Sequence, residues 1–144
     1  PIDAHRYVKV LESITNNVSQ NHLNKVIQDY ISLVYRMNNL ITEIPIKVSE
    51  KHLEIVDNIK FKRSVIIYFM FYKMIRSNMP IKRIDTLLKG FEKIEAYPLS
   101  NFIGDQYYQK KFKISAYIFN NKYLFYLFLY PIRLLNRFRL IKLL

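Results

Sequence analysis

Hydrophobic residues recur most regularly between Leu23 and Ile44, at steps of three and four positions. This spacing matches the turn of an α-helix and places the apolar side chains on one face. Pro45 follows directly, and because proline removes a backbone hydrogen bond, the helix is predicted to end before it. A stripe of this length is more typical of a core-facing helix than of a binding groove. Its members are Leu23, Val26, Ile27, Tyr30, Ile31, Val34, Met37, Leu40, Ile41 and Ile44.

Three more helices are predicted in the first two thirds of the chain. One runs from Asp3 to Val18, and a polar stretch near Ser19–Asn21 separates it from the next. Another begins after Ser49, a good N-cap, and ends at Arg76, with basic residues in its last turn. The third of these has Pro80 at its first helical position and continues to Ile94. Their apolar positions again follow helical spacing.

The segment Val65–Tyr72 is apolar on every side of its helix. It is much shorter than the ~20 residues that span a bilayer, so it predicts a buried core helix. An irregular segment, Tyr97–Asp105, follows the fourth helix. A last helical region starts near Gln106, is weakened at Asn120-Asn121 and is expected to kink at Pro131.

These patterns predict an all-α protein, an irregular bundle of about five or six helices. Only 2 Gly and 5 Pro occur, and this scarcity of turn formers favours long helices over a sheet. The predicted core region is 1–105, and 106–144 forms a basic, aromatic C-terminal segment that we expect to pack as one unit with it. The chain starts at Pro1 with no signal-peptide pattern after it, which suggests part of a longer protein.

Candidate catalytic chemistry is sparse. The chain has no cysteine, and Gly90 and Gly104 cannot build a glycine-rich phosphate loop. His5, His22 and His52 lack the helical spacing of a metal motif, so capping or surface roles are favoured; His22 is expected to precede its helix. The paired carboxylates of Glu50, Glu54 and Asp57 lie beside lysines, which is typical of a solvated face. We therefore predict no catalytic, cofactor-binding or metal-binding residue in this chain.

Charge and aromatic residues concentrate at the C-terminal end. The net charge is +12, and residues 105–144 carry eight Lys and Arg against Asp105 alone. The run Tyr123–Tyr130 is apolar and aromatic, and a basic stretch follows it. Aromatic rings and long cations at an apolar boundary are typical of a helix in a membrane interface. The candidate interface residues are Lys122, Tyr126, Tyr130, Arg133, Arg137, Phe138, Arg139 and Lys142.

Two alternatives remain open for this segment. The aromatic run can pack on the rest of the protein and leave only the arginines exposed. Stacking on single-stranded nucleic acid is a further alternative, although the strand or loop context of known stacking platforms is absent.

The chain resembles, over essentially its whole length, the helical region that follows the catalytic domain of bacterial family 2 glycosyltransferases with the GT-A fold. The residues that carry this resemblance are Arg6–Leu11, Tyr68–Ile75, Tyr97-Pro98-Leu99 and Tyr130–Phe138. The family's metal-binding Asp-x-Asp and catalytic base belong to the upstream domain. No Asp-x-Asp occurs here, so no catalytic residue is carried over.

The resemblance implies a non-catalytic C-terminal part of an enzyme that transfers a sugar from a nucleotide-sugar donor to a surface-polysaccharide or lipid-linked acceptor. The helices would support the acceptor side and membrane association. Nucleotide-sugar and a divalent metal would bind only in the upstream domain. The implied partners are that domain and an anionic membrane surface at the cytoplasmic, inner face of the cell membrane. An exposed aromatic tail is also a candidate surface for pairing with a second copy of the chain. The alternative is a stand-alone helical module that binds a protein partner or, less in keeping with the residues, nucleic acid.

Overall fold

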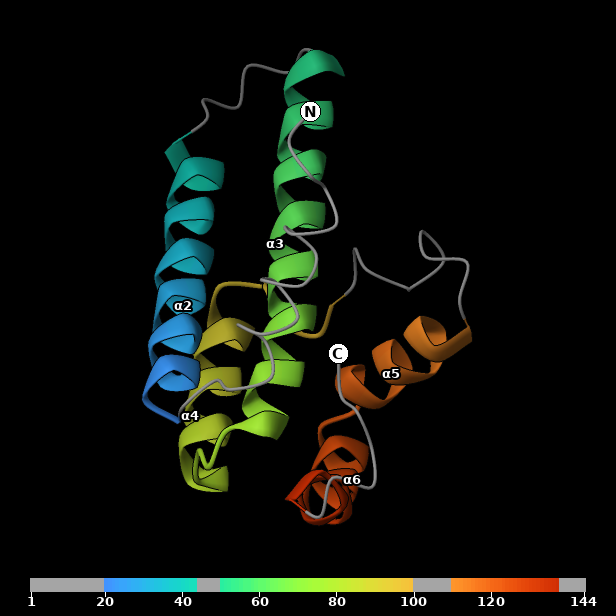
Figure 1. Cartoon of the computed structure of the whole chain (residues 1–144). Helices are drawn as coiled ribbons and strands as arrows, with labels where there is room; N and C mark the ends of the chain where they lie inside the picture. Colours follow the sequence, from blue (N-terminus) through green and yellow to red (C-terminus); the bar gives the residue numbers. More distant parts are fainter. Residues whose placement is uncertain (1–19, 44–49, 100–109, 138–144) are drawn as a thin grey trace, which may run out of the picture.

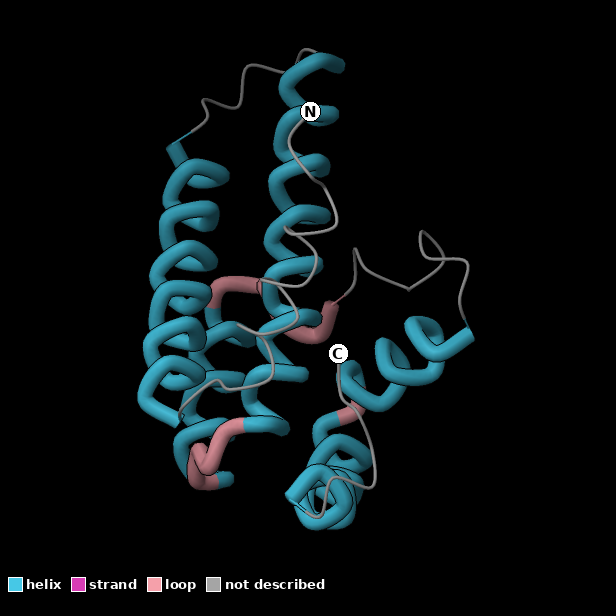
Figure 2. The backbone as a smooth tube through the Cα atoms, viewed as in Figure 1, coloured by secondary structure: helices cyan, strands magenta, loops and turns pink. Residues whose placement is uncertain are grey.

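The computed structural model describes residues 20–43, 50–99 and 110–137 (Figure 1). Within these ranges the chain forms five helices and no strand (Figure 2), which confirms the predicted irregular all-α bundle. The helix predicted over 3–18 and most of the predicted irregular segment lie outside the described residues. The helices are α2 (Gln20–Glu43), α3 (Glu50–Arg76), α4 (Ile81–Lys93), α5 (Lys110–Asn120) and α6 (Lys122–Arg137).

Helices α2 and α3 lie side by side, and α4 lies beside the end where α2 begins and α3 ends (Figure 1). Most of the predicted stripe of α2 faces inward, with Leu23, Ile27 and Val34 buried, but Leu40 is 51% exposed, so its predicted place on the core-facing side is wrong. His22 lies inside the first turn of α2, so the prediction that it precedes the helix is wrong. Because residues 20 and 21 already adopt helical geometry, the helix begins earlier than its apolar period indicates.

The C-terminal half of α3 forms the centre of the core, as the sequence predicts. Tyr68, Met70 and Phe71 are fully buried there. The Phe71 ring stacks on Phe119 of α5 at a centroid distance of 4.7 Å and meets the edge of Phe125 of α6 at 4.8 Å. Aromatic pairs in these geometries add to the stabilisation from burial. Phe71 thus joins three helices at one point.

The ends of α4 differ slightly from prediction. Pro80 is the N-cap, with φ −60° and ψ 144°, and the helix starts one residue later at Ile81. The residue before a helix adopts extended geometry, and proline's fixed φ allows that as readily as a first helical position. Gly90 lies near the C-terminal end of α4, and a Cβ there would lie 2.8 Å from the hydroxyl oxygen of Tyr35 on α2, so a larger residue would require the Tyr35 side chain to shift.

Arg63 of α3 is buried and closes the C-terminal end of α4. Its guanidinium donates to the Glu95 carbonyl at 2.8 Å, to the Ile94 carbonyl at 3.4 Å and to Asn38 Oδ1 of α2 at 2.7 Å. Glu95 has φ 53°, the left-handed conformation that usually follows a helix on a glycine. The arginine therefore holds a strained turn and links three helices.

Replacing Phe71 by alanine tests its place at the centre of the core. We expect Phe71→Ala to lower the free energy of unfolding by about 3–5 kcal/mol, because it removes a fully buried ring and leaves a cavity. Urea unfolding followed by circular dichroism measures this. Leu40→Ala on the exposed side of α2 is the control, expected within about 0.5 kcal/mol of the original protein. Equal losses in the two variants would contradict the assigned core.

Candidate interaction surface on α6

Helix α6 starts at a defined residue because Asn121 caps it. The Asn121 side-chain oxygen accepts a hydrogen bond from the Leu124 N–H at 3.1 Å, and this satisfies one of the free donors of the first turn. The Asn121 N–H still donates to the Ile118 carbonyl of α5 at 3.2 Å. The predicted weakness at Asn120-Asn121 is thus a break between two helices.

The inner face of α6 packs on the core through Phe125 and Leu129, each 1% exposed. Phe125 meets the edge of Phe119 at 5.9 Å, in addition to its contact with Phe71. Because an α-helix has 3.6 residues per turn, burial of these two positions turns the positions between them toward solvent.

The opposite face of α6 carries an exposed apolar stripe, which we call the outer stripe. It consists of Tyr123, Leu127, Tyr130 and Leu134, which are 86%, 68%, 68% and 55% exposed. Their spacing of four, three and four residues places them on one line along the helix. Single exposed hydrophobic residues are ordinary, but a contiguous line of four is a candidate interaction surface.

Other exposed apolar side chains occur on the same two helices. Phe128 and Leu135 adjoin the outer stripe on α6, and Ile114 and Tyr117 are exposed on α5. Neither helix contains Asp or Glu, while together they contain six Lys and Arg. The surface is therefore apolar, with positive charge in its helices and no negative charge.

One end of α6 is fixed to α4 by a cluster around Asp85. The Asp85 carboxylate lies 2.7 Å from Nζ of Lys122 and 2.9 Å from Nζ of Lys89, and it accepts a hydrogen bond from the Tyr126 hydroxyl at 3.2 Å. Lys122, Lys89 and Tyr126 hold the pKa of the Asp85 carboxyl well below its usual range. Burial, followed by the Asp85 charge, raises the pKa of Tyr126.

The other end of α6 is fixed to α3 by Arg133. Its Nη2 donates to the carbonyls of Met74 at 2.8 Å and Met79 at 2.9 Å, and its Nε donates to the Ile75 carbonyl at 3.3 Å. The carbonyls at a helix C-terminus lack helical partners and carry partial negative charge, which favours a cation. Burial lowers the pKa of the Arg133 guanidinium.

The structure separates the predicted interface residues into three groups. Lys122, Tyr126 and Arg133 make the internal contacts described above, whereas Tyr130 is exposed in the outer stripe. Arg137 is the last residue of α6, and its side chain is not among those that the structure describes. The other predicted positions, Phe138, Arg139 and Lys142, lie outside the described residues.

Sequence reasoning did not single out Tyr123, Leu127 and Leu134 as one surface. Their spacing was visible in the sequence, but Phe125, Leu129 and Ile132 on the inner face are equally apolar. The alternative in which the aromatic run packs on the protein and only the arginines are exposed is wrong, because Tyr123, Leu127, Phe128 and Tyr130 are exposed while Arg133 turns inward.

The described residues hold no group of three or more His, Asp or Glu side chains placed to bind a metal ion. Among the helices that the structure describes, none is both long enough and apolar enough to cross a bilayer. Comparison of the chain with protein-family models, with curated proteins and with solved structures gives no match.

The Asp85 cluster predicts a dependence of stability on pH. Because the pKa of Asp85 is lower in the folded than in the unfolded chain, its contribution is complete above the unfolded value of about 4 and is lost as the pH falls below it. We expect Asp85→Asn to be less stable than the original protein at neutral pH, and the difference to shrink on acidification below about pH 4.

Urea unfolding at a series of pH values measures this difference. Asp57→Asn, at an exposed position of α3, makes the same change of charge and serves as the control. A stability difference for Asp85→Asn that is unchanged between neutral and acid pH would show that the cluster does not bind α6 to α4.

Proposed function

We propose that this chain is a non-catalytic helical module that attaches to an anionic membrane surface through the outer face of α6. The observation that carries the proposal is the outer stripe, four exposed apolar side chains in line on a helix whose other face is fixed in the core. The surrounding segment supports it, because residues 106–144 contain no acidic residue and, besides Lys122 and Arg133 with their internal contacts, six further Lys and Arg.

The chemistry of the stripe favours a membrane interface over a dry protein interface. Tyr123 and Tyr130 each present an apolar ring that ends in a hydroxyl, and such side chains suit the boundary between headgroups and acyl chains. Leu127 and Leu134 provide the apolar surface that enters that boundary. The absence of acidic side chains on α5 and α6 removes repulsion from an anionic leaflet.

The size of the two contributions indicates that they act together. Full burial of an apolar side chain is worth about 1.5–3 kcal/mol, and each cation near an anionic surface adds about 1 kcal/mol. A few leucine and tyrosine side chains with several cations therefore give reversible attachment, in which neither part suffices alone.

The resemblance to family 2 glycosyltransferases supplies a wider proposal. In that setting the module follows an upstream catalytic domain and holds it near a lipid-linked acceptor at the cytoplasmic face of the membrane. The wider proposal is supported by the resemblance of residues 6–11, 68–75, 97–99 and 130–138 to that family, whereas the attachment proposal rests on the exposed face of α6. The two proposals can therefore fail separately.

A charge placed in the outer stripe tests the attachment. We expect Leu127→Glu to reduce flotation of the chain with phosphatidylglycerol-containing vesicles by at least about ten-fold, because a carboxylate resists burial and is repelled by anionic lipid. Leu53→Glu is the matched control, since Leu53 is 59% exposed on α3 and the change of charge is identical.

Three results would remove the proposal. Equal flotation with phosphatidylcholine and phosphatidylglycerol vesicles would exclude attachment through charge, and equal loss in both variants would exclude the outer stripe. The third result would come from light scattering without lipid, which measures the oligomeric state. A dimer that Leu127→Glu dissociates and Leu53→Glu does not would assign the stripe to a second copy of the chain.

A further inference from the structure

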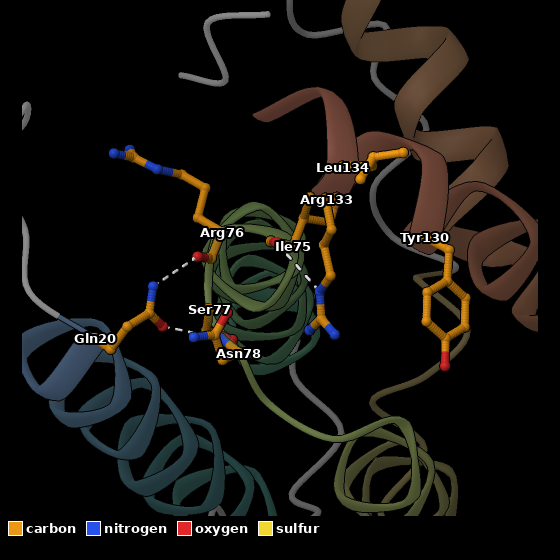
Figure 3. Close-up of a pocket in the computed structure, with 8 residues that line it drawn as sticks. All are labelled: Gln20, Ile75, Arg76, Ser77, Asn78, Tyr130, Arg133 and Leu134. Atoms are coloured by element: carbon orange, nitrogen blue, oxygen red, sulfur yellow. Dashed lines mark hydrogen bonds between the residues drawn. The ribbon is translucent and has the colours of Figure 1, made fainter. Parts of the chain in front are cut away.

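A pocket of about 560 Å³ lies where α2 begins, α3 ends and α6 passes beside them. Figure 3 shows residues from all three helices around it. Its volume is within the range of small-ligand sites in proteins. Tyr130 and Leu134 belong both to its lining and to the outer stripe, so the pocket opens beside the face that we assign to the membrane.

Hydrogen bonds of the Gln20 side chain connect polar parts of the pocket lining. The Gln20 side chain donates from Nε2 to the Arg76 carbonyl at 3.3 Å and accepts from the Asn78 N–H at 2.9 Å (Figure 3). Both ends of its amide are thus used to join the start of α2 to the end of α3.

Arg133 brings a fixed positive charge into this pocket. Its three hydrogen bonds to carbonyl groups use Nε and Nη2 only. Among the described residues its Nη1 makes no hydrogen bond, which leaves two N–H donors for a ligand. Figure 3 shows the guanidinium lying between Ile75 and Tyr130, held at the end of α3.

The pocket lining contains positive charge and no carboxylate. Arg76 is the second cation, and its side chain extends on the other side of the α3 end from Arg133 (Figure 3). Asn78 is exposed and adds a neutral amide. The Arg133 guanidinium, with no carboxylate among the lining residues, favours an anion, and its planar shape matches the geometry of phosphate oxygens.

We propose that this pocket binds the phosphate group of an anionic lipid while the outer stripe enters the adjoining acyl region. The inference rests on the proposed membrane attachment and names the chemical group that the attached module recognises. A free phosphate group offers the same chemistry, so the experiment separates the two sources.

The test uses the full chain with a carboxylate placed in the pocket. Asn78→Asp keeps the size of the side chain and places a negative charge in the lining, where it repels phosphate. Asn58→Asp makes the same change at an exposed position of α3, 20 residues and thus roughly 30 Å away along the helix. That distance exceeds the screening length of about 8–10 Å, so the control reports the change of net charge alone.

Two readouts are compared for each variant. The first is binding to phosphatidylglycerol vesicles, which we expect Asn78→Asp to weaken about five-fold and Asn58→Asp to leave within about two-fold. The second is the thermal midpoint in millimolar inorganic phosphate without vesicles, against sodium chloride of equal ionic strength. A ligand that binds the folded state raises this midpoint.

The outcomes separate the sources and the two proposals. Selective loss of vesicle binding alone assigns the pocket to a lipid headgroup, and selective loss of both responses assigns it to phosphate from either source. Selective loss of the phosphate response with equal vesicle binding overturns the lipid assignment. If the two variants behave alike in both readouts, the pocket is not an anion site, whether or not the chain binds vesicles. If the original chain binds no vesicles, the membrane attachment itself fails.

Discussion

The inward packing of Phe125 against Phe71 is the interaction on which the arrangement of this molecule depends. The two rings meet at 4.8 Å, and Leu129 follows Phe125 into the core one turn later. Since a helix cannot bury two opposite faces against one core, this contact fixes the rotation of α6. The exposed apolar face is therefore a consequence of the core packing. A helix with polar residues on that face would pack equally well, so the apolar stripe calls for an explanation outside the fold.

The tethers at the two ends of α6 complete this arrangement. Lys122 binds Asp85 on α4, and Arg133 binds the last carbonyls of α3. Arg63 and Arg133 play similar roles, because Arg63 binds the carbonyls of Ile94 and Glu95 directly after α4 and Arg133 binds those of Met74 and Ile75 in the last turn of α3. Some of the cations that suggest a surface function in the sequence thus stabilise the fold. The same contacts hold the outer stripe in place and position Arg133 in the pocket beside it.

The helices could be predicted from the sequence far better than the surface. The apolar period of α2, the basic last turn of α3 and the break at Asn121 all appear where the residues indicate. The orientation of α6 could not be predicted, because both of its faces are apolar and the pattern gives no contrast. The contacts of Arg133 could not be predicted either. Its partners lie 54–59 residues earlier in the chain, and they are backbone carbonyls, which every residue possesses.

The most direct test of the account is whether the outer stripe enters the membrane interface. The chain contains no tryptophan, so Tyr123→Trp places one fluorescent reporter at the most exposed position of the stripe, and Leu53→Trp places one on α3 as a reference. With phosphatidylglycerol vesicles, we expect the emission of Trp at position 123 to shift to shorter wavelength and that at position 53 to stay unchanged. Unchanged emission at position 123, or an equal shift at both positions, would contradict the account.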